Sequence, residues 1–221
     1  MGEHTKHATS RAQLRERIIE VAAESFSTSG IKCVTMDDIA ASLGISKRTL
    51  YEVFSDKESL LEACILRDQE ETDRFIVEIL RESDNVLEVL LKVYQRSIEK
   101  FHGTNKSFFE DIKKYPKAYE AMRRDDHRNH EDAINFFRQG VEQGLFRDDV
   151  NFAIVGLLVR HQLDALLETD LCSRYSFLEV YESIMFTFLR GIATEKGALE
   201  LENFIRGYRQ RQHPAGSGKE E

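Results

Sequence analysis

The sequence contains no tryptophan, two prolines and three cysteines among its 221 residues. Because proline is scarce and Leu, Glu, Lys, Arg and Ala are abundant, the composition predicts an all-α fold rather than a strand-rich one. Cys33, Cys64 and Cys172 are too few and too scattered for a disulfide framework or a paired zinc spacing. There is also no N-terminal apolar run typical of a signal peptide, and no apolar stretch near the roughly 20 residues that span a bilayer. We therefore expect a soluble, cytoplasmic protein without membrane contact.

An excess of positive charge, common in proteins that bind nucleic acids, is also missing, since the formal net charge is −8. The charge is unevenly distributed. Residues 1–57 contain eight Lys or Arg and eight Asp or Glu, so the whole net negative charge lies in residues 58–221. A neutral N-terminal segment with Lys47, Arg48 and Lys57 can bind phosphates, whereas an acidic body limits non-specific binding to DNA.

Sequence signatures of enzymes are absent, including the nucleophile elbow, the phosphate-binding loop and the dinucleotide fingerprint. His127 and His130 are three residues apart, but the surrounding charges at 123–128 favour a solvated helix face over a metal site. We expect no catalytic residue, no metal and no cofactor. Cys33 follows Lys32, which leaves a redox-sensing thiol open as an alternative role.

The segment Thr35–Lys57 has the pattern of two short helices joined by a tight turn. Thr35 and Asp38 approximate a capping box, so the first helix should begin there. Gly44 suits the left-handed conformation at a helix C-terminus, and Ser46 can cap the second helix. The shared apolar face is formed by Met36, Ile39, Ala40, Leu43, Leu50, Val53 and Phe54.

The outward side of the second helix is basic, hydroxylated and aromatic, which suits a helix that reads the major groove of DNA. Two short amphipathic helices joined by glycine also occur in other all-α proteins, so the spacing alone leaves a purely structural role open. We expect Lys47 and Arg48 to contact bases, and Tyr51, Lys57 and Thr35 to contact phosphates. The candidate DNA-binding residues are Thr35, Ser46, Lys47, Arg48, Thr49, Tyr51 and Lys57.

The stretch TMDDIAASLGISKRTLYEVFSDKESLL resembles the N-terminal DNA-binding segment of the TetR/AcrR family of bacterial regulators. The resemblance covers about residues 11–66 and contains no gap, although Arg48 stands where many relatives have glycine. It implies an N-terminal three-helix domain that contains the helix-turn-helix, a C-terminal helical body that binds a small-molecule effector, and a homodimer formed through that body. It also implies a regulator, usually a repressor, that binds a palindromic operator in double-stranded DNA.

The remaining chain is helical in pattern, with breaks near glycine and proline residues. Ser55 and Glu58 suggest a capping box ahead of a long helix that should link the two parts of the protein. Helices are expected at about 11–29, 56–81, 85–101, 105–114, 117–143, 149–171, 176–195 and 198–210. We expect a mobile arm at 1–10, a DNA-binding domain at 1–55, an effector-binding and dimerisation domain at 56–210, and a disordered tail at 211–221.

The helices expected at 149–171 and 176–195 are apolar on more than one face. A helix buried on one side only would not need this pattern, so it favours burial against a second subunit. The resemblance likewise implies a four-helix dimer interface made by this pair. A monomer that buries both helices at its centre is the alternative.

The many aromatic residues of the body favour an apolar pocket for a small apolar or aromatic effector. His161, beside Gln162 in an apolar helix, is interpreted first as a core or interface histidine and second as a ligand contact. The candidate ligand-binding residues are Phe101, Phe108, Tyr119, His161 and Gln162. A dimer that needs no effector is the alternative, and its body would have a filled core.

Overall fold

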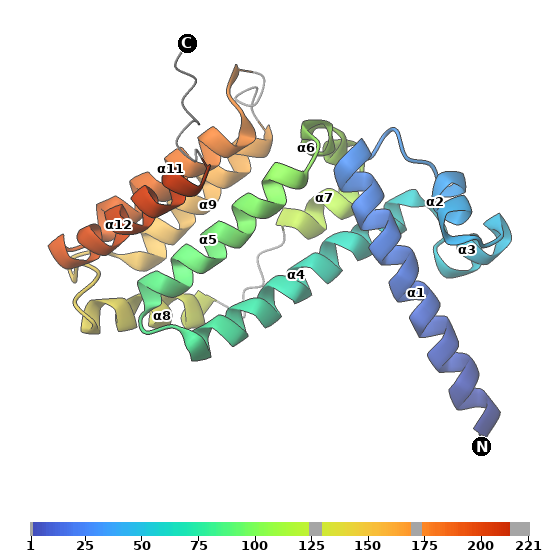
Figure 1. The fold of residues 1–221 in the computed structure, drawn as a ribbon, viewed down its shortest axis with the longest axis horizontal. Helices are drawn as coiled ribbons and strands as arrows, with labels where there is room; N and C mark the ends of the chain where they lie inside the picture. The colour runs from blue at the N-terminus through green and yellow to red at the C-terminus, as the bar shows by residue number, and fades with distance from the viewer. Residues whose placement is uncertain (1, 124–129, 169–173, 213–221) are drawn as a thin grey trace, which may run out of the picture. The chain divides into compact units, whose positions relative to one another are not determined.

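The computed structural model describes residues 2–123, 130–168 and 174–212, and within these ranges every regular element is a helix (Figure 1). The all-α class predicted from the composition is therefore confirmed. The elements are α1 (Gly2–Ser29), α2 (Met36–Leu43), α3 (Lys47–Val53), α4 (Lys57–Glu82), α5 (Val86–Gly103), α6 (Lys106–Asp111), the 3₁₀ helix η1 (Ile112–Lys114), α7 (Pro116–Arg123), α8 (His130–Glu142), α9 (Phe152–Glu168), α11 (Phe177–Ile192) and α12 (Glu195–Gln212).

The first helix is longer than the sequence pattern predicted. Helix α1 begins at Gly2, so residues 2–10, which were expected to form a mobile arm, are part of the helix. Neither proline nor glycine occurs between residues 3 and 29, so no backbone feature interrupts the helix. Gly30, at a positive φ of 83°, donates its N–H to the Phe26 carbonyl at 3.0 Å and ends α1.

The start of α4 also differs from the prediction, because Ser55 and Glu58 do not form a capping box. Asp56 caps the helix instead, and its carboxylate accepts a hydrogen bond from the Ser59 N–H at 2.7 Å. This bond, with that from the Ser55 hydroxyl, lowers the pKa of Asp56. Asp56 directly precedes the first helical residue, which is the position from which a short side chain reaches the free N–H groups. Glu58 accepts the N–H of Lys117 at 2.9 Å.

The C-terminal helices are found close to their expected ranges. The helix expected at 117–143 is described as α7 and α8, and the residues between them, with His127, lie outside the described ranges. Cys172 also lies outside them. Helix α12 continues to Gln212, which takes two residues from the expected tail, and residues 213–221 are not described.

The chain packs as two compact units, each with its own core. The first unit comprises residues 1–75 and 99–125, and the second comprises residues 76–98 and 126–221. The first half of α4 shares a core with α1, α2 and α3 through Leu60, Leu61 and Cys64. The packing unit is therefore larger than the DNA-binding domain expected at 1–55, whose functional boundary stays a prediction.

An aromatic cluster forms the centre of the second unit. The fully buried ring of Tyr94, on α5, stacks on Tyr181 at 5.9 Å between centroids and lies 4.8 Å from Phe186. Phe204 and Tyr208, on α12, meet the same ring edge-on at 6.3 and 6.0 Å. Helices α5, α11 and α12 are thus held together by ring contacts. In neither unit does a described helix combine the length and apolarity that crossing a bilayer requires.

A candidate nucleic-acid interface

Helix α2 begins with the predicted capping box. The Thr35 hydroxyl accepts the Asp38 N–H at 3.2 Å, and the Asp38 carboxylate accepts the Thr35 N–H at 2.8 Å. Hydrogen bonds from the Thr35 hydroxyl and backbone lower the pKa of Asp38. Thr35 is exposed, but both its hydroxyl and its N–H already serve the helix.

The turn and the second cap also follow the sequence prediction. Gly44 has a φ of 65°, and the Ile45 N–H reaches back to the Ala40 carbonyl at 3.0 Å. Ser46 then caps α3 by accepting the Thr49 N–H at 3.1 Å, and the hydroxyls of the two residues lie 2.8 Å apart. These contacts fix the direction in which α3 leaves α2.

The three-helix packing expected from the sequence is present in the first unit, where α2 and α3 lie beside α1 (Figure 1). Leu50 of α3 is fully buried in the same core as Ile39 of α2 and Phe26 of α1. The buried members of this core are Ile18, Ile19, Ala22, Phe26, Ile31, Val34, Met36, Ile39, Ala40, Leu50, Phe54, Leu60, Leu61, Ala63, Cys64, Ile112 and Ala118.

The opposite side of α3 presents Lys47, Arg48, Tyr51 and Glu52 to solvent, and we call these four residues the reading face. Lys47 pairs with Asp37 of α2, and this hydrogen-bonded ion pair raises the pKa of Lys47. Arg48, whose side chain is 89% exposed, pairs with Glu52 one turn later, at 2.9 Å from Nε to Oε1. Lys47, Arg48 and Tyr51 were predicted from the sequence, whereas Glu52 was not, although it lies four residues after Arg48, the spacing of an ion pair on one helix face.

Lys57 lies apart from the reading face. Its ammonium group lies over the rings of Phe26 and Tyr115, at 5.7 and 5.8 Å from their centroids. Partial burial lowers the pKa of Lys57, against the opposing effect of the nearby Asp111 charge. This position gives Lys57 a packing role in the first unit, and its contact with a phosphate stays a prediction.

The segment from α6 to α7 is hydrogen-bonded to the ends of α1 and α4. The Asn105 N–H donates to the Ser27 carbonyl at 2.7 Å. Asp111 accepts the Lys32 N–H at 2.9 Å and the Lys114 ammonium at 2.9 Å, and it is the one charged side chain that is buried among those described. The buried carboxylate of Asp111 therefore holds the loop that leads into α2 through its hydrogen bond with the Lys32 N–H.

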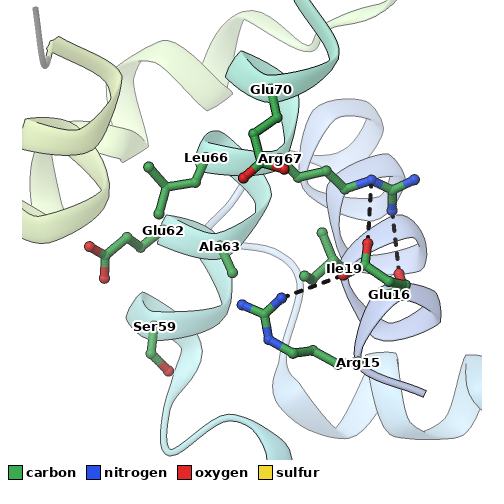
Figure 2. Close-up of a pocket in the computed structure, with 9 residues that line it drawn as sticks. All are labelled: Arg15, Glu16, Ile19, Ser59, Glu62, Ala63, Leu66, Arg67 and Glu70. Atoms are coloured by element: carbon green, nitrogen blue, oxygen red, sulfur yellow. Dashed lines mark hydrogen bonds and ion pairs between the residues drawn. The ribbon is translucent and has the colours of Figure 1, made fainter. Parts of the chain in front are cut away.

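An open groove of about 320 Å³ lies between α1 and α4 (Figure 2). Arg67 of α4 reaches across to α1, where it donates to the Glu16 carbonyl at 3.3 Å. It also pairs with Glu71 at 3.0 Å. The groove is lined by Arg15, Glu16, Ile19, Ser59, Glu62, Ala63, Leu66, Arg67 and Glu70, and contains none of the predicted ligand-binding residues.

The predicted ligand-binding residues are divided between the two units. In the first unit, Phe101 and Phe108 each pack edge-on against Phe109, and Tyr119 lies under the Arg123 guanidinium at 5.5 Å. In the second unit, His161 and Gln162 are exposed on α9, so His161 is not a core histidine of its own chain.

Gln162 lines an open groove of about 460 Å³ beside the Arg147–Asp149 ion pair. The groove is not the closed apolar cavity that an effector pocket would need, so the effector site stays a prediction. Within the described part of the chain, no three His, Cys, Asp or Glu side chains are grouped to hold a metal.

Comparison with known proteins gives a consistent result for the N-terminal part of the chain. Residues 18–64 match the family described as bacterial regulatory proteins, tetR family. The HTH-type transcriptional regulator YvaF of Bacillus subtilis is 41% identical over 87 residues, which are 37% of this chain and 43% of YvaF. UidR of Escherichia coli, another HTH-type transcriptional regulator, is 46% identical over 56 residues, or 25% of this chain and 29% of UidR. The chain thus matches less than half the length of both relatives.

A similar fold extends over most of the chain. A transcriptional regulator from Cytophaga hutchinsonii superposes with a TM-score of 0.60 at 23% identity, over 81% of this chain and 98% of that one. The N-terminal helix-turn-helix and C-terminal helical body expected from the sequence are therefore confirmed as a fold.

Proposed function

We propose that this chain, whose residues 18–64 match the family of bacterial regulatory proteins described as the tetR family, is a ligand-responsive repressor. It binds a palindromic operator as a homodimer and is released by a small apolar or aromatic effector. The observation that carries this proposal is the reading face, which an intact capping box, a left-handed Gly44 and a second cap hold outward from a buried core. A helix presented in this way can enter the major groove with its N-terminal residues against base edges.

The homodimer is supported by an apolar face on α9. Ile154, Leu157 and Leu158 are exposed at helical spacing, with 55%, 51% and 56% of their surface accessible. Three large apolar side chains side by side are rarely left in water, and a second copy of the same face would cover them. Two-fold symmetry would then set two reading faces about 34–36 Å apart, one turn of DNA.

The release mechanism is supported by the path of α4. Residues 57–75 of α4 belong to the first unit, where Arg67 ties the helix to α1, and residues 76–82 belong to the other unit. A ligand that binds one position of α4 more tightly than another would therefore shift the population of reading-face positions. The alternative, a dimer that needs no effector, would bind the operator in the same way but would not be released by a ligand.

The proposal is tested by selecting operators from random double-stranded DNA with the full-length protein and measuring affinity by fluorescence anisotropy. Lys47→Ala should cost about 1–3 kcal/mol on the selected operator and little on random DNA. Arg138→Ala, an exposed change on α8, is the matched control and should leave both affinities unchanged. Failure of the wild-type protein to prefer any sequence would contradict the proposal.

The effector is tested by screening apolar and aromatic compounds for two simultaneous effects. An effector should raise the melting temperature and weaken operator binding, because it stabilises a folded state in which the spacing of the two reading faces does not match that of successive major grooves. A compound that stabilises the fold but leaves operator affinity unchanged would favour the effector-independent alternative.

A further inference from the structure

One residue at the C-terminal end of α3 is held by two arginines. The Glu52 carboxylate accepts a hydrogen bond from Nε of Arg48 at 2.9 Å, and the Glu52 carbonyl accepts one from Nη2 of Arg11 at 3.1 Å. Arg11 belongs to α1, so it ties the end of the reading helix to the neighbouring helix. A carbonyl in the last turn has no partner within its own helix, which is why an arginine can serve it here.

The ion pair leaves the rest of the Arg48 guanidinium available. Glu52 occupies Nε, whereas the two terminal nitrogens have no hydrogen-bond partner within the described part of the chain. Those nitrogens form the planar fork that binds O6 and N7 of guanine, the commonest specific contact in the major groove. A guanidinium that is already oriented by a carboxylate loses less freedom on binding than a free one.

The carboxylate also acts against other contacts. Glu52 is exposed on the reading face and carries a charge of the same sign as the phosphates, so with α3 in the major groove it disfavours binding to the DNA backbone. To reach a phosphate with its whole guanidinium, Arg48 would have to leave Glu52. The pair therefore favours sequence selectivity over raw affinity.

We propose that Arg48 and Glu52 together read one guanine in each half of the operator, with Glu52 as the positioning residue that orients Arg48. The proposal rests on the proposed function, since it requires α3 to lie in the major groove. Arg11 completes the arrangement by holding the backbone at Glu52. Lys47 of the reading face pairs with Asp37 of α2, but its ammonium is a point charge and lacks the planar fork of a guanidinium.

The test compares Glu52→Gln with Asp37→Asn, because each removes one negative charge close to the reading face. Wild-type protein is used to select an operator, and affinities are then measured for symmetric substitutions at every position. We expect the wild type to prefer guanine at one position by about tenfold or more. Glu52→Gln should lose most of that preference and bind random DNA as well as or better than the wild type, whereas Asp37→Asn should keep the preference.

Two further variants separate orientation of Arg48 from general damage to the fold. Arg48→Ala should abolish the same preference, and adding Glu52→Gln to it should cause no further loss of base preference, because the two residues act on that base as one unit. Circular dichroism should show unchanged helicity in all variants. If Glu52→Gln keeps the wild-type preference at every position, this inference is overturned while the proposed function stands. If the wild type prefers no sequence at all, the proposed function itself fails.

Discussion

Residues 11–57, which we call the reading domain, are shaped mainly by contacts between neighbours in sequence, whereas the second unit is held together by rings from distant helices. Around α2 and α3, the capping box, the left-handed glycine, the second cap and the shared core are found at the predicted residues. In the second unit the helices are near their expected positions, but His161 and Gln162 are exposed, and a packed aromatic cluster centres on Tyr94.

The difference reflects how each kind of site is built. A DNA-reading helix carries its chemistry on about twenty consecutive residues, where local spacing decides which side chains point outward. An effector site gathers side chains from helices that are distant in sequence, and helical periodicity does not say which of them meet. We therefore expect changes in the second unit to act on assembly, and changes in the reading domain to act on base preference and local stability.

The largest expected effect is a loss of operator affinity when the two copies of the chain can no longer pair through the second unit. Leu158→Glu places a charge on the exposed apolar face of α9, and should give monomers because a buried, unpaired carboxylate is costly. Operator affinity should fall by about 10²–10⁴-fold, since one reading domain no longer holds the other near the DNA. Sedimentation velocity and anisotropy measure the two effects.

Leu199→Glu is the matched control, because Leu199 on α12 is 65% exposed and lies off the α9 face. It should stay dimeric and bind the operator normally. Phe186, on the other helix expected at the interface, is unsuitable for this test because its ring is buried against Tyr94 in the same chain. If the Leu158→Glu variant stays dimeric, the dimer interface does not include this face of α9.

Around the reading domain, most contacts that the sequence did not predict join segments that are distant in the chain. The sequence identifies Lys57 as a cation near the helix-turn-helix, but not the rings of Phe26 and Tyr115 on which it packs. It likewise gives no reason for Asp111, 79 residues away, to hold the Lys32 N–H. Contacts between distant segments depend on the packed fold, so the sequence does not predict them. The pair of Arg48 and Glu52 is different, because residues four apart on a helix are neighbours and their ion pair can be predicted from spacing alone.

A smaller effect is expected when the distant contact is removed from the reading domain. Asp111→Ala leaves the Lys32 N–H and the Lys114 ammonium without their partner, and should destabilise the first unit by about 1–3 kcal/mol at neutral pH. Faster hydrogen exchange of the Lys32 amide reports the loss directly. Asp132→Asn, an exposed change on α8, should leave that amide unchanged.

The same variant should have a characteristic pH dependence. Burial raises the pKa of Asp111, but the hydrogen bonds from Lys114 and Lys32 outweigh this effect and hold it below its usual value. A carboxylate with a lowered folded pKa stabilises the fold above its unfolded pKa of about 3.9, and this contribution is lost as the pH falls through the folded pKa. The difference in urea midpoint between wild type and variant should therefore shrink from pH 7 towards pH 3. A constant difference would mean that the charge of Asp111 does not stabilise the fold.

The smallest expected effect compares two helix caps with the same chemistry. Thr35 and Asp38 cap α2, and Ser176 and Glu179 cap α11 through a matching pair of bonds, each with a 3.2 Å contact from backbone N–H to hydroxyl. Thr35→Ala and Ser176→Ala should each cost about 1 kcal/mol of stability. Only Thr35→Ala should also weaken binding to the selected operator relative to random DNA, because α2 sets the position of the reading face. Equal operator affinity in the two variants, measured by anisotropy well below both melting temperatures, would show that α3 holds its position without the cap at Thr35.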